Sequence, residues 1–322
     1  MRASALDGFG GPEKLMPRQL PVPIIAADEV LVRVHTAGVG IWDVKARRGD
    51  WASGKEHFPL VLGADGSGTI VAAGAEVRDL NPGDLVYGYL SGESKGGFYA
   101  EYVAVNGAHL APLPATLDLR DAGGVATTGI TALAGIDDAL ALRAGDTVII
   151  HGATGGVGSV AVQFAKRRGA RVIATARGAD GAQFLRRLGI DDIVDVQHED
   201  VPAFVQQLVP GGVDALLALA GGPALGRALD ALRPGGRIAY PNGVTVPARD
   251  GYEARAFDGD PSPTAFARLS ATIDAGPFEV PIGALFALDE AADAHRLIER
   301  GHVLGKIVLA VDEIEEDIEK VA

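Results

Sequence analysis

A glycine-rich turn between an apolar run and a helix-like segment is the stretch of this chain best suited to binding a phosphate. The run from Val148 to Ile150 predicts a buried strand, and the turn from Gly152 to Gly158 follows it. An amphipathic pattern then predicts a helix ending near Gly169, and a second buried strand runs from Arg171 to Ala176. This order is typical of dinucleotide-binding units, in which the helix start offers free amides and a positive dipole end to a pyrophosphate.

The turn has the pattern A-x-G-x-x-G, with Ala153 where the first glycine usually stands. Gly155 would let the backbone approach the pyrophosphate, and Gly158 would let helix and strand pack closely. A tight turn without a ligand is the alternative for the same glycines. The turn residues that we expect to bind the cofactor are Gly152, Thr154, Gly155, Gly156, Val157 and Gly158.

The end of the second predicted strand bears on which dinucleotide is bound. NAD-binding proteins place an acidic residue there to accept hydrogen bonds from the ribose hydroxyls. Here the strand ends at Thr175, Ala176 and Arg177 without a carboxylate, and Arg177 can pair with a 2′-phosphate. We therefore predict NADPH as the cofactor, with Thr175 and Arg177 beside it. An exposed loop arginine is the alternative, and nearby Asp180 counts against the phosphate interpretation.

Helix-like and strand-like segments alternate from residue 119 onward, which predicts a doubly wound parallel sheet. The further strands are expected at 193–196, 213–219 and 237–240, and the helices at 182–188, 201–209 and 223–232. In such sheets ligands bind at the carboxyl ends of the strands. Ala220, Asn242 and Gly243 follow two of these strands and should border the same cofactor.

Residues 1–118 have a different pattern, and strand-like runs punctuated by glycine and proline predict an irregular β-barrel-like domain. The second domain is expected at 119–263, where 247–263 reads as a polar surface loop. Helices at 264–275 and 289–300, the latter with Asp289 as N-cap, and a strand at 306–311 should follow. The last residues form an acidic amphipathic tail, most simply a solvated terminal helix.

Composition excludes several classes of function. The formal net charge of −13 and the lack of basic patches argue against a nucleic-acid partner. The chain has no cysteine, so disulfides, thiolate catalysis and cysteine-ligated zinc are ruled out. No signal peptide and no run long enough to cross a bilayer are evident, and we expect a cytoplasmic protein without a membrane partner.

A series of ordered landmarks resembles the medium-chain dehydrogenase/reductase superfamily, most of all its zinc-free quinone and enone reductase branch. The landmarks are AGV with Trp42-Asp43, LGADGSGTIVAAGAEV, NPGDLVYG, GGFYAEYV, the nucleotide unit and HRLIERGHVLGKIVL. Together they cover nearly the whole chain. The resemblance implies an α/β fold, with a doubly wound parallel (Rossmann) domain and an irregular GroES-like β-barrel domain that about 264–322 returns to complete.

The same resemblance bears on zinc. Zinc-dependent relatives carry a cysteine after the A-G-V stretch and a histidine-glutamate pair further on, and the matching positions here are Gly40 and Ala64-Asp65. Gly40 and Ala64 have no donor atom, and the four-cysteine zinc lobe is replaced by the short segment 88–97. We therefore predict no metal. The glycines between residues 63 and 74 fail the G-x-G-x-x-G pattern and are interpreted as turns in the barrel.

Candidate catalytic residues come from the resemblance. Trp42, Asp43 and Lys45 match positions beside the nicotinamide ribose and the substrate, so Lys45 is expected to polarise an enolate or bind the ribose, with Asp43 orienting it. A solvated charge pair is the alternative. Thr127 matches a position near the nicotinamide, although a threonine bonded to its own helix backbone fits too. Gly305 and Lys306 are also implied to reach the cofactor.

Without a metal, the substrate should be an electrophile that needs little help from a Lewis acid. We therefore predict NADPH-dependent, zinc-independent reduction of quinones or α,β-unsaturated carbonyls by hydride transfer. An enoyl-thioester reductase and a non-catalytic NADPH-binding protein with a structural or regulatory role remain alternatives. The expected partner is a small electrophilic substrate. Relatives are often dimers or tetramers, and the sequence leaves a homodimer open.

Overall fold

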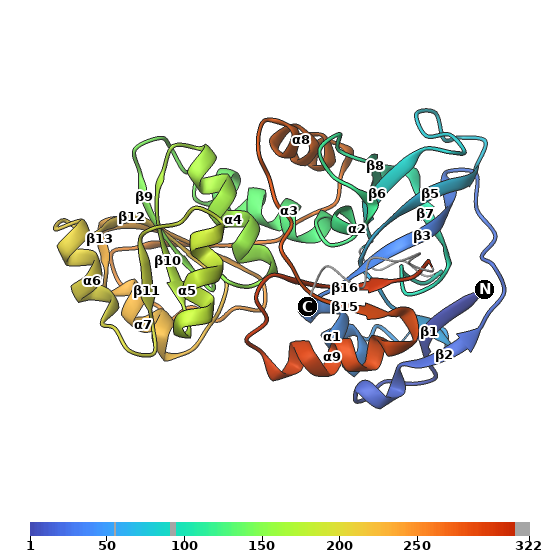
Figure 1. The fold of residues 1–322 in the computed structure, drawn as a ribbon, viewed down its shortest axis with the longest axis horizontal. Coiled ribbons are helices and arrows are strands. Elements are labelled where there is room, and N and C mark those ends of the chain that lie inside the picture. The colour runs from blue at the N-terminus through green and yellow to red at the C-terminus, as the bar shows by residue number, and fades with distance from the viewer. Residues whose placement is uncertain (55, 91–94, 313–322) are drawn as a thin grey trace. The chain divides into compact units, whose positions relative to one another are not determined.

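The computed structural model describes residues 1–54, 56–90 and 95–312, and the chain divides into two compact units (Figure 1). The first contains Met1–Thr127, Pro261–Gly276 and Ile282–Ala322, and the second contains Thr128–Asp260 with Pro277–Pro281. The sequence placed the first boundary after residue 118. The acidic tail from residue 313 and part of the 88–97 segment lie outside the described residues.

The second unit is built on a six-stranded parallel sheet in the order β11-β10-β9-β12-β13-β14. Its strands are β9 (Thr147–His151), β10 (Arg171–Ala176), β11 (Ile193–Asp195), β12 (Val213–Ala218), β13 (Leu232–Pro241) and β14 (Glu253–Phe257). This is the 3-2-1-4-5-6 order of a Rossmann sheet, in which ligands bind where the order reverses, beside the first strand. The predicted fold class is confirmed here, and the reversal lies between β9 and β12.

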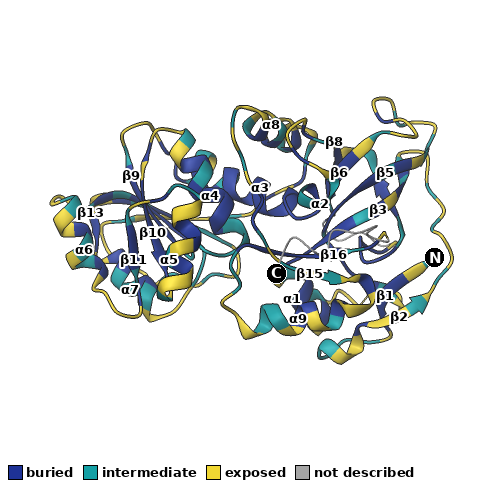
Figure 2. Ribbon diagram, viewed as in Figure 1, coloured by how far each residue is buried: buried dark blue, intermediate teal, exposed yellow. Residues whose placement is uncertain are grey.

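Helices of the second unit cover this sheet because each has one apolar stripe. They are α4 (Gly156–Arg167), α5 (Gly178–Arg187), α6 (Val201–Leu208), α7 (Pro223–Leu229) and the π-helix η3 (Ala134–Ala139), which continues α3 (Ala126–Leu133). In Figure 2 the strands are mostly buried, whereas α5 and α6 expose their outer faces. The helix-like stretch that begins at residue 119 is divided into three short helices, α2 (Leu119–Ala122), α3 and η3.

A larger sheet forms the barrel-like first unit, with the strand order β15-β16-β3-β5-β6-β8 and β7 paired to β3. Its strands are β3 (Glu29–Val39), β5 (Asp65–Ala73), β6 (Leu85–Tyr89), β7 (Tyr102–Asn106), β8 (Leu110–Pro112), β15 (Ile282–Ala287) and β16 (Lys306–Ala310). A small sheet adds β1 (Arg2–Leu6), β2 (Met16–Gln19) and β4 (Leu60–Val61). The antiparallel pairing of β16 with β3 adds a strand from late in the chain to the barrel sheet.

The helices of the first unit are α1 (Ile41–Arg48), α2, α8 (Pro263–Asp274) and α9 (Ala291–Arg300), with short 3-10 turns η1 (Pro12–Lys14), η2 (Gly107–His109) and η4 (Leu288–Glu290). Asp289 was predicted to cap the last long helix, but it lies within η4, and Glu290 is the N-cap of α9. A 3-10 turn preceding the helix explains the shift, because the chain is already coiled when it reaches Asp289.

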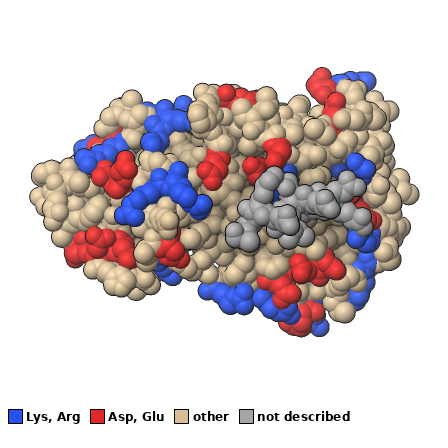
Figure 3. Space-filling model, viewed as in Figure 1, with Lys and Arg blue, Asp and Glu red and all other residues tan. Residues whose placement is uncertain are grey.

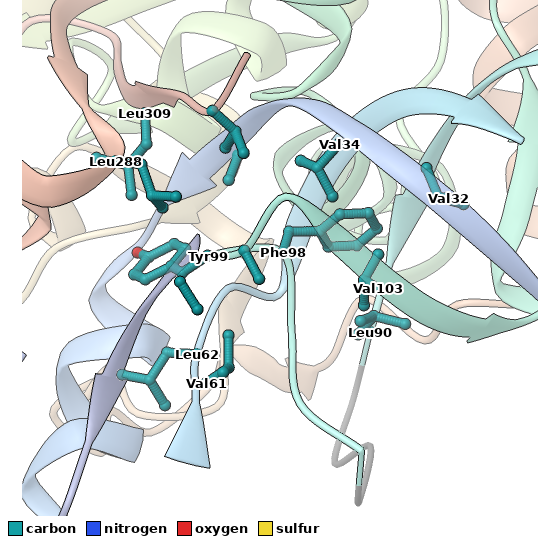
Figure 4. Close-up of a cluster of buried hydrophobic side chains, with 14 of the residues drawn as sticks. Val32, Val34, Val61, Leu62, Leu90, Phe98, Tyr99, Val103, Leu288 and Leu309 are labelled. Atoms are coloured by element: carbon teal, nitrogen blue, oxygen red, sulfur yellow. The ribbon is translucent and has the colours of Figure 1, made fainter. Parts of the chain in front are cut away.

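Apolar side chains from both sheets fill the core of the first unit (Figure 4). Phe98 lies near Val34 and Val103, and Tyr99 lies between Leu62 and Leu288 with its oxygen pointing away from Phe98. Gly66 makes this packing possible, because a Cβ there would come within 2.0 Å of the Phe98 ring. The interpretation of the glycines at 63–74 as turns was therefore wrong for Gly66, which lies inside β5.

Acidic and basic side chains are interspersed on the face shown in Figure 3, and its described surface has no continuous basic stripe. None of the helices in the described ranges is long and apolar enough to cross a membrane.

Candidate active site

The glycine turn joins β9 to α4 at the carboxyl edge of the parallel sheet. Gly152 adopts the left-handed conformation, with φ of 84°, and Gly155 is the N-cap of α4. A Cβ on Gly158 would lie 2.2 Å from the Gly152 carbonyl oxygen, so only glycine lets this helix approach the strand so closely. The role that sequence analysis gave Gly158 agrees with this contact.

The start of α4 has the properties of a phosphate-binding site. The first intrahelical bond joins the Ser159 amide to the Gly155 carbonyl, so the amides of Gly156, Val157 and Gly158 precede the helical ladder. A Cβ on Gly155 would meet only the Gly152 oxygen, at 3.7 Å, which leaves room for a ligand against the backbone. Free amides, open space and the positive end of a helix fit the pyrophosphate of a dinucleotide.

Thr175 holds the ends of the first two strands together. Its hydroxyl oxygen accepts a hydrogen bond from the Gly152 amide at 3.1 Å and lies 3.1 Å from His151 Nδ1. Burial, together with the charges of Arg177 and Arg227, lowers the pKa of His151 to about 4, so the imidazole is neutral and can accept the Thr175 proton. Thr175 therefore shapes the turn through its side chain.

Arg177 is exposed at the end of β10, where it is also the N-cap residue of α5. The nearest acidic strand end is that of β11, whose Asp195 lies beside Ala176 in the sheet. The Asp195 carboxylate is engaged, because it accepts bonds from the Gly178 and Gln197 amides and contacts His198. Arg177 therefore supplies a positive charge at this edge of the sheet, and the nearby Asp195 carboxylate is already hydrogen-bonded. This combination suits the binding of an anion.

The other predicted residues of the second unit lie at neighbouring strand ends. A Cβ on Gly152 would contact the Ala220 side chain at 3.2 Å, so the segment after β12 adjoins the glycine turn. Asn242 follows β13, donates a side-chain bond to Asp258, and precedes Gly243, whose φ is 96°. The structure thus places the predicted cofactor residues of this unit along one edge of one sheet.

A buried ion pair is the centre of the candidate site in the first unit. The Lys306 ammonium on β16 lies 2.6 Å from Asp65 Oδ2 on β5, and both side chains are almost fully buried. The other Asp65 oxygen accepts a bond from the Thr127 amide at 2.7 Å. Within the described part of the chain, the buried hydroxyl oxygen of Thr127 has no hydrogen-bond partner. An unsatisfied buried hydroxyl of this kind could bind a polar ligand atom.

Trp42 fills the space beside Gly40. A Cβ on Gly40 would lie 2.0 Å from the indole ring, so no larger side chain fits there unless the ring moves. The Lys306 ammonium lies 4.5 Å from the centre of the same ring, a favourable cation–π arrangement. Residues 1–54, 56–90 and 95–312 contain no group of three or more histidine or carboxylate side chains placed to hold a metal ion.

Asp43 ties two segments of this region together. Its carboxylate accepts hydrogen bonds from the Gly40 amide at 2.7 Å and from the Ala64 amide at 3.1 Å. Burial raises its pKa from 3.8 to about 7, although these bonds and the Lys306 charge oppose the shift. Asp43 therefore joins the start of α1 to the residue preceding β5.

Lys45 and Asp43 make different contacts in this structure, and the orientation of Lys45 by Asp43 stays a prediction. The two residues are two positions apart on α1, and such side chains do not share a helix face. The Lys45 ammonium instead lies 5.4 Å from the centre of the exposed Trp51 ring. Gly305, with φ of 87°, makes the turn that delivers Lys306 to its strand.

Sequence reasoning did not find the partners of these residues. Asp65 was considered only as a zinc-motif position, and its pairing with Lys306 joins residues 241 positions apart. The buried group of Arg47, Tyr99 and His295 was also missed as a cluster. A buried arginine leaves no local sequence signal, because Arg47 stands between Ala46 and Arg48 in an ordinary charged helix.

The fold and these two groups of residues define a class: a dinucleotide-binding α/β unit with a β-barrel partner, the architecture of a dehydrogenase. Family models agree. Residues 26–115 match the alcohol dehydrogenase GroES-like domain, and residues 156–247 match the zinc-binding dehydrogenase domain.

Curated relatives are similar along nearly the whole chain. The quinone oxidoreductase of Mus musculus is 29% identical and covers 96% of this chain and 97% of its own length. The chloroplastic NADPH-dependent alkenal/one oxidoreductase of Arabidopsis thaliana is also 29% identical, over 96% of this chain and 79% of its own.

Solved structures extend the likeness. An NAD-dependent alcohol dehydrogenase is 33% identical with a TM-score of 0.88, covering 97% of this chain and 100% of its own. The quinone oxidoreductase of Coxiella burnetii is 30% identical with a TM-score of 0.86, and the match covers 97% of this chain and 99% of that protein. A mycobacterial protein in complex with NADPH is 26% identical with a TM-score of 0.85, and the match covers 97% of this chain and 100% of that protein. This chain belongs to the medium-chain dehydrogenase/reductase superfamily, in its quinone oxidoreductase branch.

Proposed function

We propose that this protein is an NADPH-dependent reductase of quinones or α,β-unsaturated carbonyls that works without zinc. The observation that carries the proposal is the surroundings of Gly40, because the Trp42 ring occupies the space where a metal-binding side chain would project. A site without a Lewis acid favours a substrate whose conjugated system spreads negative charge by itself. Quinones and enones have this property, and simple ketones do not.

The chemistry divides between the two groups of residues. When bound, the nicotinamide supplies a hydride to the electrophilic carbon of the conjugated substrate. The amides at the start of α4 and the Arg177 guanidinium hold the phosphates of the dinucleotide. Lys45 stabilises the negative charge that develops on the substrate oxygen, and a proton from water or a side chain completes the reduction.

The preference for NADPH rests on the end of β10. Arg177 supplies a positive charge there, and Asp195 is occupied by the Gly178 amide and two other donors. A charge-assisted bond to the 2′-phosphate would contribute ~1.5–3 kcal/mol. The likeness to proteins named for NADPH supports this choice, whereas the structural relative named as NAD-dependent makes the comparison with NADH the essential control.

A turnover screen tests the proposal. Purified protein is assayed with NADPH and with NADH against a benzoquinone, a vinyl ketone, an enoyl-thioester and a simple ketone. We expect NADPH oxidation with the first two substrates at rates well above those with the ketone. Higher activity with the enoyl-thioester would assign the protein to thioester reduction instead. Tight NADPH binding without turnover on any substrate would support a non-catalytic role.

A further inference from the structure

Three large polar side chains are buried in the core of the first unit. Arg47 on α1, Tyr99 in the segment before β7, and His295 on α9 each have 0% of their surface exposed. Arg47 donates from Nη2 to Glu299 Oε1 at 2.7 Å and from Nε to the Gly10 carbonyl. Buried polar groups of this size are costly unless each is hydrogen-bonded, so their mutual contacts determine which atoms act as donors.

Arg47 fixes the tautomer of His295. Arg47 Nη1 lies 3.4 Å from His295 Nδ1, and a guanidinium can only donate hydrogen bonds. Burial and the charge of Arg47 lower the pKa of His295 to about 3, so the ring is neutral. Nδ1 is therefore the acceptor, and the ring proton resides on Nε2.

The direction of the next contact follows from this tautomer. His295 Nε2 lies 3.2 Å from the Tyr99 hydroxyl, and since Nε2 carries the proton, the Tyr99 oxygen is the acceptor. Tyr99 and Asp43 both contact the segment before β5: the Tyr99 amide donates to the Leu62 carbonyl, and Asp43 accepts from the Ala64 amide. The Tyr99 proton is therefore free to turn toward the Asp43 carboxylate. Burial, followed by the charges of Asp43 and Asp65, raises the pKa of Tyr99 far above its usual range, so the phenol keeps its proton.

We propose that His295 and Tyr99 are positioning residues, which orient the Asp43 carboxylate so that it can hold Gly40 and Ala64 together. Donors run in one direction, from Arg47 to His295 to Tyr99 to Asp43. This series of hydrogen bonds does not conduct protons to solvent, because a guanidinium does not release its proton in the accessible pH range. Its function is to fix geometry.

The proposal connects a remote cluster to the candidate site. Asp43 is itself influenced by the Lys306 ammonium on β16 and by the Asp65 carboxylate on β5, and the Asp43, Asp65 and Arg47 charges all act on Tyr99. The two backbone amides that donate to Asp43 fix Gly40, which lies against the Trp42 ring, and Ala64, which precedes β5. This inference rests on the proposed function only for the claim that these residues form a substrate site.

A fluorescence titration tests the positioning independently of activity. The chain has two tryptophans, so a Trp51→Phe background leaves Trp42 as the only one. The Trp42 ring lies 4.5 Å from the Lys306 ammonium, which interacts with Asp43, and its emission should report the Asp43 charge. We expect a transition near neutral pH that disappears with Asp43→Asn. Tyr99→Phe removes one donor to the carboxylate and should move the midpoint upward by about one pH unit.

Tyr87→Phe is the matched control. Tyr87 is also fully buried, and its hydroxyl bonds to Ser270 at 2.9 Å, away from Asp43. Both variants lose one tyrosine hydroxyl from the core, but only Tyr99→Phe should move the midpoint. Equal midpoints in the two variants, or no transition that depends on Asp43, would overturn the proposal.

Variants at His295 separate positioning from simple packing. His295→Gln can keep a nitrogen donor near Tyr99, whereas His295→Leu cannot, so glutamine should restore most of the wild-type midpoint and leucine should not. If the enzyme reduces enones, Tyr99→Phe should lower kcat with little change in the KM for NADPH, and Tyr87→Phe should change neither. Loss of both predicted patterns would refute the positioning role. Absence of wild-type turnover with an intact fluorescence pattern would refute the proposed function alone.

Discussion

Arg177 and Lys45 carry two of the charges on which the proposed chemistry depends, and each can be removed with little effect on packing. Arg177 is exposed at the end of β10. Arg177→Ala should raise the KM for NADPH by about tenfold or more, because a charge-assisted bond to the 2′-phosphate is lost, and should leave NADH nearly unaffected. Arg186→Ala, an exposed arginine in the last turn of α5, is the control. Equal weakening with both cofactors would show that Arg177 supports the loop.

Lys45 is tested by its effect on turnover. Lys45→Met keeps most of the side-chain stem and removes the ammonium near Trp51. If this charge stabilises the enolate, turnover with an enone should fall on the order of a hundredfold, equivalent to ~2–4 kcal/mol, while NADPH affinity is retained. Stopped-flow measurement of the hydride step at saturating NADPH gives the answer. Weaker NADPH binding with unchanged turnover would assign Lys45 to the ribose, and no change would leave it a surface charge.

At this scale the sequence indicated residues whose role is local, and it missed those that depend on distant partners. The glycine turn could be predicted because strand, turn and helix are contiguous in the chain. The pairing of Lys306 with Asp65 and the contact of Arg47 with His295, 248 positions apart, could not be predicted. Local periodicity does not reveal which buried polar groups meet in the folded chain.

The packing of α4 against β9 is the contact between elements that most directly shapes the cofactor site. Gly158→Ala would place a Cβ 2.2 Å from the Gly152 carbonyl oxygen, so the helix must shift. We expect a loss of about 1–3 kcal/mol in the free energy of unfolding and much weaker NADPH binding. Gly226→Ala is the control, because this glycine of α7 has open space around it and should gain up to about 1 kcal/mol. Similar stabilities and affinities in the two variants would contradict the packing argument.

Elements were predictable where burial gave them a clear pattern. The strands from β9 to β12 are apolar runs covered on both faces, and their existence follows from the sequence. The edge strand β14 was predicted as part of a loop, because most of its residues are exposed and it lacks an apolar run. Helix α1 was missed for a similar reason: it is short and strongly charged, with Asp43 and Arg47 turned into the core.

For the whole molecule, stability should depend on pH through Asp43. Its pKa rises from 3.8 to about 7 on folding, so between these values the folded state binds a proton that the unfolded state has released. The free energy of unfolding relative to Asp43→Asn should therefore fall as pH rises through this window, and level off above it. His151 and His295 have lowered pKa values, so their contributions to the free energy of unfolding change with pH in the opposite direction. These contributions are the same in wild type and Asp43→Asn and therefore cancel when the two proteins are compared. Urea unfolding of both proteins across pH checks this, and parallel curves would contradict it.

The central claim is that hydride transfer from NADPH to a conjugated substrate proceeds here without a metal. The most direct measurement is a single-turnover reaction with NADPH deuterated at the transferred position, using chelator-treated protein whose zinc content is determined in parallel. We predict no stoichiometric zinc, an unchanged rate after chelation, deuterium on the β-carbon of the reduced enone, and a primary isotope effect on the hydride step with either substrate class. About one zinc per chain that is lost together with the reaction would contradict the account.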